Sequence, residues 1–238
     1  MRTIQWSDYT WITEERWGNL HPEKTYAWYD SHAVSIGTDN SLHLKTHYSP
    51  RWFPNLKVWS NTGVGLVSCT TKFKWGEFVI LAKLPTGLNL WPAFWAWSWD
   101  TWPPEIDVFE GYTNKYSNYS LWGFLPLRRI ESNIHYIKDN IKQSLAIGNW
   151  LVFKDPTQCF ISYKMVWLPD SIKIYYNNRL IRTINDPLIM DQLNKTTLNV
   201  VINNHVTKDQ DKTYSTDNLE SLEQTSDFVI KHFKYTPM

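Results

Sequence analysis

The chain has 238 residues, of which 16% are aromatic and 20% are charged, and its formal net charge is +1. This length fits one domain, residues 1–238, and the balanced charge excludes a strongly basic nucleic-acid-binding surface. No run of 18 apolar residues is present, and the N-terminus lacks the apolar segment of a signal peptide, so neither a membrane-spanning helix nor a leader is expected. Cys69 and Cys159 match no disulfide framework or metal motif, so they are expected to be buried apolar residues.

Short strands separated by turn residues are predicted along most of the chain. Residues 34–36 and 42–44 flank Gly-Thr-Asp-Asn and predict a hairpin, and Asn177-Asn178 predicts a type I′ turn between strands at 173–176 and 179–181. Further strands are expected at 65–68 and 73–84, as a pair, and at 197–203 and 227–235. Short helices are expected near 187–195 and 217–223, and residues 111–149 are expected to contain long loops. The pattern predicts an all-β sandwich or jelly roll.

The segment EIDVFE holds three carboxylates, Glu105, Asp107 and Glu110. On a strand Glu105 and Asp107 share a face, but Glu110 has the wrong parity unless a β-bulge at Val108–Phe109 restores it. The strand rise then leaves about 5 Å between the two glutamate carboxyl groups, the separation of a retaining rather than an inverting glycosidase. An ordinary solvated strand face is disfavoured, because adjacent like charges destabilise a sheet.

Tryptophans precede this segment at alternate positions, and one strand face would therefore be a row of indoles. A strand beside EIDVFE would bring these indoles and the carboxylates into one groove. Indoles stack on the apolar faces of sugar rings. We expect Trp91 and Trp95 to bind sugar and Trp102 to line the cleft, whereas Trp97 and Trp99 are expected to close one end of the sandwich.

Several blocks resemble glycoside hydrolase family 16, the laminarinase-like β-glucanases and their agarase and carrageenase relatives. The motif E-x-D-x-x-E is matched by EIDVFE. It is preceded in the family's order by NTGVGLVS, FKWGEFVILAKLPTG and LWPAFW, and followed by MVWLPDSIKIYYNNRLIRTI, LNVVINN and FVIKHFKY.

The resemblance implies a concanavalin A-like jelly roll with an open concave cleft, and a retaining endo-hydrolase. Glu105 would be the nucleophile, Glu110 the general acid/base and Asp107 the helper between them. His135 would lie in the cleft, and Asn61 and Asn133 are added as candidate substrate contacts. The partner would be a polysaccharide or oligosaccharide acted on outside the cell. No cofactor or metal is expected, and the chain is expected to be a monomer.

Some positions depart from the family's pattern. Val79 and Leu81 replace a common Glu and Arg, which argues against a glucanase-like substrate contact, and Lys231 replaces an Asp that often helps to bind calcium. Three alternatives remain beside a β-1,3- or mixed-linkage β-glucan hydrolase. They are a β-galactan hydrolase acting on agar, carrageenan or a host glycan, a non-catalytic carbohydrate-binding jelly roll, and a transglycosylase with the same covalent intermediate.

Overall fold

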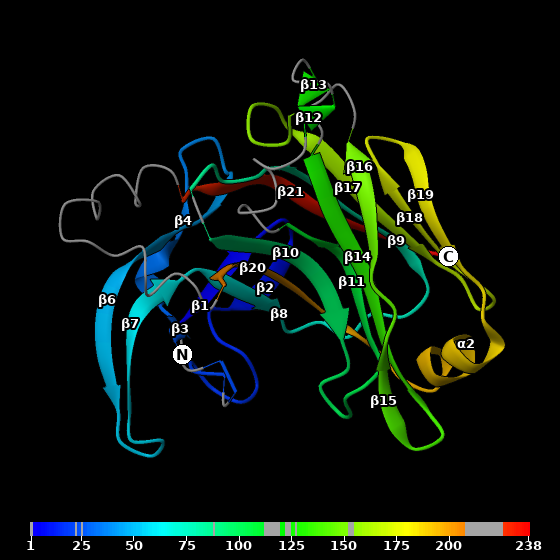
Figure 1. Cartoon of the computed structure of the whole chain (residues 1–238), viewed down its shortest axis with the longest axis horizontal. Helices are drawn as coiled ribbons and strands as arrows, with labels where there is room; N and C mark the ends of the chain where they lie inside the picture. Colours follow the sequence, from blue (N-terminus) through cyan, green and yellow to red (C-terminus); the bar gives the residue numbers. More distant parts are fainter. Residues whose placement is uncertain are drawn as a thin grey trace.

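The computed structural model describes residues 2–21, 23–24, 26–87, 89–111, 120–121, 125–126, 128–151, 155–207 and 226–238. Two large antiparallel sheets pack face to face as a sandwich (Figure 1). In the described part of the chain, no helix has both the length and the apolar character needed to cross a membrane. The all-β sandwich predicted from the sequence is confirmed.

The larger sheet has nine strands and carries the acidic segment near its middle. Its strand order is β1-β2-β8-β20-β10-β11-β14-β15, and β16 also pairs with β14. The strands are β1 (Thr3–Trp6), β2 (Tyr9–Ile12), β8 (Leu66–Cys69), β20 (Asn199–Val206), β10 (Leu90–Trp97), β11 (Glu105–Glu110), β14 (Arg128–Lys138), β15 (Ile141–Ser144) and β16 (Ile147–Leu151).

The smaller sheet of the sandwich has seven strands in the order β19-β18-β17-β9-β21-β5-β4. Its central strand β9 pairs with β17 on one side and with β21, close to the C-terminus, on the other. The strands are β19 (Arg179–Ile184), β18 (Ile172–Tyr176), β17 (Ile161–Trp167), β9 (Gly76–Lys83), β21 (Phe228–Pro237), β5 (Leu42–Leu44) and β4 (Val34–Ile36).

A third sheet joins β3 (Ala27–Tyr29), β7 (Val58–Val64) and β6 (Thr46–Phe53), and its β6–β7 hairpin projects from the sandwich (Figure 1). The remaining elements are β12 (Ser120–Leu121), β13 (Leu125–Pro126), the 3-10 helix η1 (Ser31–Ala33) and α2 (Pro187–Asn194). Asp186 is the N-cap of helix α2, and its carboxylate accepts hydrogen bonds from the backbone N–H groups of Leu188 and Ile189. Pro187 occupies the first turn, where its missing N–H costs no hydrogen bond.

The core lies between the two large sheets and follows the strand alternation. Phe78 and Ile80 point inward from β9 and meet Phe94 and Ile106 from the other sheet in one buried cluster. Burial of each such side chain contributes about 1.5–3 kcal/mol relative to exposure. The opposite faces of the same strands are free to carry polar groups, which is how β11 presents carboxylates on the outside of the larger sheet.

The local predictions at turns and at the helix are confirmed. β4 and β5 form the predicted antiparallel hairpin, and β18 and β19 form the second. Asn177 and Asn178 have φ of 49° and 64°, as a type I′ turn requires. Helix α2 lies within 187–195, whereas the helix expected at 217–223 falls outside the described residues.

Two predictions were wrong. The strands expected at 65–68 and 73–84 do not pair, because β8 and β9 lie in opposite sheets and the chain crosses the sandwich between them. The loops expected in 111–149 are contradicted at 128–138, which form the 11-residue strand β14, whereas residues 112–119, 122–124 and 127 lie outside the described residues. The alternation of β14 is obscured because the core-facing position between Ile130 and Ile134 is Ser132, whose carbonyl oxygen accepts a hydrogen bond from buried Arg182 at 2.9 Å.

Candidate active site

A cleft of about 730 Å³ lies on the outer face of the nine-stranded sheet. Four neighbouring strands supply its floor, β20, β10, β11 and β14, and the N-terminal segment and the residues around Trp102 supply its sides. The three carboxylates of β11 all line this cleft. So do Trp91, Trp95, Trp102, Asn133 and His135, the predicted substrate contacts other than Asn61.

The predicted bulge is present in β11. Against β10, Phe109 pairs with Phe94 and Asp107 pairs with Trp95, which leaves Val108 without a partner. Against β14, Asp107 pairs with Asn133 and Glu110 pairs with Glu131, so two residues of β11 oppose one of β14. The extra residue restores the parity of Glu110 and brings all three carboxylates into the cleft.

The bulge is held from the core side. Val108 and Phe109 are both fully buried, and both belong to the core cluster between the two large sheets. The Phe109 ring lies 4.3 Å from that of Tyr163, centroid to centroid. Tyr176 of β18 donates its hydroxyl hydrogen bond to the Val108 carbonyl oxygen at 2.8 Å, so the irregular backbone keeps a buried partner.

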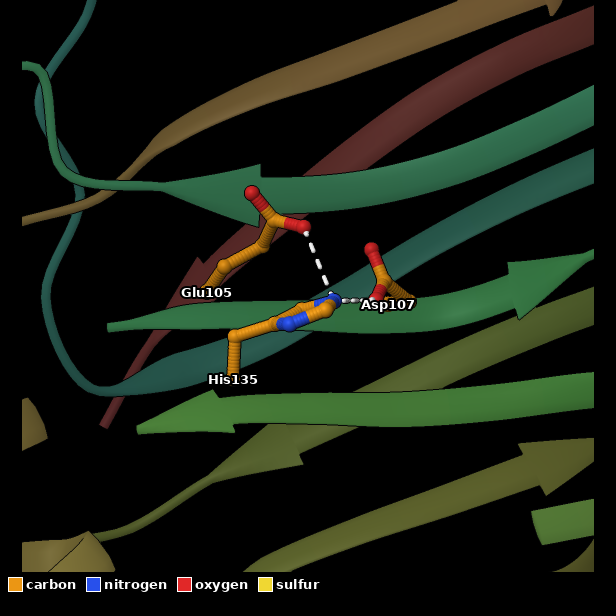
Figure 2. A group of neighbouring side chains, drawn as sticks. All are labelled: Glu105, Asp107 and His135. Carbon is orange, nitrogen blue, oxygen red and sulfur yellow. Dashed lines mark ion pairs between the residues drawn. The ribbon is translucent and has the colours of Figure 1, made fainter. Parts of the chain in front are cut away.

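Glu105, Asp107 and His135 form a compact group at one end of the acidic strand (Figure 2). His135 Nε2 lies 3.4 Å from Glu105 Oε1 and 3.4 Å from Asp107 Oδ2. The other oxygen of Glu105 accepts a hydrogen bond from Trp102 Nε1 at 2.9 Å. These contacts fix the carboxyl group of Glu105 from two sides and orient it within the cleft.

Crowding raises the affinity of this group for a proton. Burial, and then the charge of Asp107, raises the pKa of Glu105 to about 8, against the opposing effects of His135 and Trp102. Burial and the charge of Glu110 raise the pKa of Asp107 well above its usual range. Because Glu105 and Asp107 both lie 3.4 Å from His135 Nε2 and both have raised pKa values, the pair can hold one proton between them.

Asn133 determines how the His135 ring is used. Its Oδ1 accepts hydrogen bonds from the backbone N–H of Ile134 at 2.9 Å and from Ser144 Oγ at 3.0 Å, so its Nδ2 faces His135 Nε2 at 3.1 Å. In the neutral ring, Nε2 therefore accepts from Asn133 and the ring proton lies on Nδ1. Asn133 thus acts on the acidic group through His135.

Two indoles of β10 donate hydrogen bonds across the cleft floor. Trp91 Nε1 donates to Glu110 Oε1 at 3.1 Å, and Trp95 Nε1 donates to Asn203 Oδ1 at 2.7 Å. Trp97 is buried and packs against Trp95 with a 6.4 Å centroid separation. Trp91 therefore orients the carboxyl group of Glu110, and it also lines the cleft.

Two lysines lie over cleft indoles. Lys24 Nζ is 4.2 Å from the centroid of the Trp91 ring, and Lys142 Nζ is 4.4 Å from that of Trp102. Both contacts are cation–π interactions, which are weak where water has access. A ligand that stacks on either indole must displace the ammonium group or share the ring with it.

The N-terminal segment supplies cleft residues that sequence reasoning missed. Trp17 lines the cleft with its ring centroid 5.1 Å from that of Trp97, and it stands in a turn closed by backbone hydrogen bonds between Glu15 and Gly18. Glu15 is buried beneath, and burial raises its pKa to about 8. The motif TEERWGN has no periodicity, and only its Trp-Gly pair hinted at an aromatic turn.

Three residues interpreted from the sequence lie away from the cleft. Asn61 is exposed on β7 and does not line the cleft. Val79 and Leu81 alternate with the core residues of β9 and face outward from the seven-stranded sheet. Val79 and Leu81 therefore cannot contact a substrate in the cleft. Their replacement of Glu and Arg is no argument against a glucan substrate, and the expectation based on it was wrong.

A metal ion could be held, by geometry alone, at Glu105, Asp107 and His135, whose ligand atoms all lie within 4.8 Å of one another. The same atoms already have protein partners in Trp102 and Asn133. Two carboxyl groups and an imidazole in mutual contact can share a proton as well as hold a metal ion. The hydrolysis of a glycoside by two carboxyl groups requires no metal.

Comparisons with solved structures show the same fold. A Bacteroides ovatus family 16 enzyme bound to a mixed-linkage glucan product superposes with a TM-score of 0.67, at 20% identity over 96% of this chain and 94% of that one. The Thermotoga maritima laminarinase catalytic domain gives 0.66 at 15% identity, covering 90% and 84%. A structure from work on endo-acting O-glycanases of the human gut microbiota, which initiate mucin breakdown, gives 0.69 at 20% identity, covering 89% and 80%.

Sequence comparison gives the same family. The endo-1,3-1,4-beta-glycanases ExsH and EglC of Rhizobium meliloti (strain 1021) are 26% and 27% identical to this chain over 114 residues, which are 48% of the chain and 22% of each relative. The family model "Glycosyl hydrolases family 16" matches residues 22–221. The chain therefore belongs to glycoside hydrolase family 16.

Proposed function

We propose that this chain is an endo-acting, anomer-retaining β-glycanase that cleaves a β-1,3- or mixed-linkage β-glucan. The observation that carries the proposal is the bulged strand β11, which brings Glu105, Asp107 and Glu110 into one cleft. The Bacteroides ovatus mixed-linkage glucanase and the Rhizobium meliloti endo-1,3-1,4-beta-glycanases support the substrate class.

In the proposed first step the Glu105 carboxylate attacks the anomeric carbon while Glu110 gives its proton to the leaving glycosidic oxygen. A glycosyl ester of Glu105 forms and the aglycone leaves as an alcohol. Trp102 and Trp91 hold the two carboxyl groups through their N–H donors. Glu105 must be the anion to attack, and the charge of the neighbouring Asp107 sets the pH at which Glu105 loses its proton.

In the second step Glu110, now a carboxylate, takes a proton from a water molecule that attacks the same anomeric carbon. The ester bond breaks, Glu105 is released as a carboxylate, and the product keeps the starting anomeric configuration. A sugar hydroxyl in place of water would give transglycosylation through the same intermediate. The cleft of about 730 Å³ crosses four strands, which supports binding of an internal segment of a polymer and therefore endo-acting cleavage.

A charged glycan is the second candidate substrate. Lys24 and Lys142 stand over the cleft indoles and would meet sulfate or carboxylate groups of a carrageenan or a host O-glycan. The similarity to the O-glycanase structure is of the same order as the similarity to glucanases. This candidate predicts that activity on a charged polymer falls with added salt.

The test is a reducing-end release assay on laminarin, mixed-linkage β-glucan, agarose, carrageenans and mucin, with wild type and Glu105→Gln in parallel. Release by the wild type alone, a rapid fall in viscosity and an initial β-anomer in proton NMR would support the proposal. An initial α-anomer would overturn retention. Binding without release on every polymer would instead favour a non-catalytic carbohydrate-binding domain.

A further inference from the structure

The β6–β7 hairpin carries a pair of exposed indoles outside the cleft. Trp52 and Trp59 lie directly opposite each other on the two strands, and their side chains are 44% and 63% exposed. Their ring centroids are 5.8 Å apart, with the planes tilted by 47°. Neither lines the catalytic cleft. Two large aromatic faces are therefore presented side by side to the solvent.

Stabilisation of the hairpin does not require this exposure. Other residues support the hairpin from below: Trp28 Nε1 donates to the Ser49 carbonyl oxygen at 2.7 Å, and the Arg51 guanidinium lies 4.8 Å from the Trp28 ring. A cross-strand aromatic pair stabilises a hairpin through the contact between its two rings, and this contact does not need the outer ring faces. The outer faces of Trp52 and Trp59 contribute nothing to this support and remain hydrated.

The surroundings of the pair fit a sugar chain. Asn61 lies two residues after Trp59, so it shares the strand face of that indole, and it is exposed. Residues 46–64 contain Arg51 and Lys57 but no Asp or Glu. Flat apolar faces beside an amide match the C–H face and the hydroxyl rim of a pyranose ring, and a surface without carboxylates accepts a neutral or an anionic glycan.

The hairpin is also continuous with the cleft. β3 pairs in parallel with β7, and its Tyr29 lines the cleft while the neighbouring Trp28 lies under Arg51. Figure 1 shows the β6–β7 hairpin on the side of the molecule opposite the β14–β15 hairpin. The hairpin and the cleft are thus linked through β3.

We propose that Trp52, Trp59 and Asn61 form a second carbohydrate-binding site that holds a segment of the same polysaccharide outside the catalytic cleft. The inference rests on the proposed function for the identity of the polymer. Binding at a second point raises the local concentration of a long chain at the cleft but leaves a short substrate unaffected. Loss of the site should therefore raise KM for polymer and leave kcat unchanged.

The test compares Trp52→Ala/Trp59→Ala, the milder single variant Trp59→Ala and the control Leu180→Ala, which removes an exposed apolar side chain on β19. Retardation in gels containing laminarin, mixed-linkage β-glucan, carrageenan or mucin is measured in the Glu105→Gln background, so that no polymer is cleaved. We expect the double variant to lose about fivefold or more in affinity for one polymer and the control to lose none.

In the active enzyme, kcat/KM for that polymer should fall about as much, while kcat/KM for its shortest cleaved oligosaccharide stays constant. Equal retardation of all three variants would overturn the proposal. So would equal losses on polymer and oligosaccharide. Two other outcomes, each with unchanged glycan retardation, would also overturn the proposal. If the wild type is a dimer and the double variant a monomer, the indole pair serves self-association. If the wild type binds phosphatidylcholine vesicles and the double variant does not, the pair binds a lipid surface.

The two proposals fail in different ways. If the wild type cleaves no polymer but is retarded through Trp52 and Trp59, the hairpin site stands and the proposed hydrolysis does not. If the wild type cleaves a polymer and the double variant is retarded as strongly as the wild type, the proposed hydrolysis stands and the hairpin site does not. Circular dichroism and the melting temperature of Trp59→Ala check that the fold is intact.

Discussion

The indoles of the cleft and those of the β6–β7 hairpin use the same side chain in opposite ways. In the cleft, Trp91 and Trp102 donate their N–H groups to the carboxyl groups of Glu110 and Glu105. On the hairpin, Trp52 and Trp59 contact each other and leave their faces open to water. The first pair orients acids, and the second presents apolar area.

This difference separates two contributions to the use of a polymer. Groups that orient the reacting carboxyl groups are expected to change kcat, whereas an exposed aromatic platform far from them is expected to change only the affinity for long chains. Composition alone treats all fifteen tryptophans as equivalent. Substitution of single residues in and beneath the cleft should therefore change kcat, pH dependence or stability.

Replacement of Glu105 by Gln should have the largest effect. The isosteric amide cannot attack the anomeric carbon, so kcat should fall by at least about 10⁴-fold while polymer binding persists. The matched control is Glu77→Gln, because Glu77 lies on the opposite sheet and pairs with Lys164. Substantial residual turnover in purified Glu105→Gln would contradict the nucleophile assignment.

Replacement of Glu110 by Ala should lower kcat by about 10²–10⁴-fold on natural glycosides, because the leaving oxygen loses its proton donor. Aryl glycosides with good leaving groups need little protonation, and azide can replace the activated water in the second step. Both should therefore restore turnover. The measurement is initial rate with and without azide, and a lack of rescue in both assays would count against Glu110 as the acid/base.

Asp107→Asn should shift the pH dependence. The charge of Asp107 is one of the two main causes that raise the pKa of Glu105 to about 8. Without it Glu105 loses its proton at lower pH, so the acid limb of the kcat/KM profile should move down by about one pH unit, with a lower maximum rate. A limb that stays in place, or moves to higher pH, would show that Asp107 does not control Glu105.

Trp102→Phe should have a smaller effect on catalysis. The ring is retained, but the hydrogen bond from Nε1 to Glu105 Oε2 is lost. Hydrogen bonds to charged groups contribute about 1.5–3 kcal/mol, so kcat should fall by about tenfold or more. A change confined to KM would instead mean that Trp102 serves only as a sugar platform.

Glu15→Gln should change stability rather than turnover. Because burial raises the pKa of Glu15 to about 8, the folded protein binds this proton more tightly than the unfolded chain. Its contribution is full below about pH 4.5 and is lost as pH rises through about 8, at up to about 1.4 kcal/mol per pH unit. The variant should show a flatter melting temperature between pH 5 and 8, and an unchanged slope would refute buried proton binding.

The acidic strand could be predicted almost completely from the sequence, since the parity of Glu105, Asp107 and Glu110 has one simple solution, the bulge at Val108. Strand alternation and turn chemistry are local, and so Asn177 and Asn178 were also predicted correctly. Strand alternation and turn preferences are therefore sufficient to predict features that depend only on residues close together in the sequence.

Long-range placement was not predictable in the same way. β8 and β9 are neighbours in sequence but lie in opposite sheets, and no local signal specifies which sheet a strand joins. Asn61 is the first residue of the family-like block NTGVGLVS, yet β7 carries it on the projecting hairpin. Ser132 concealed β14 because its partner, Arg182, comes from the other sheet.

The hydrogen bond from Tyr176 to the Val108 carbonyl oxygen links the seven-stranded sheet to the spacing of the reacting groups. The sheet that lies away from the cleft thereby helps to set the distance between the proposed nucleophile, Glu105, and the proposed proton donor, Glu110. Directed evolution that samples only cleft residues would leave this distance untouched. Substitutions behind the sheet offer a separate route to retune the reaction while every group that touches the glycan keeps its identity.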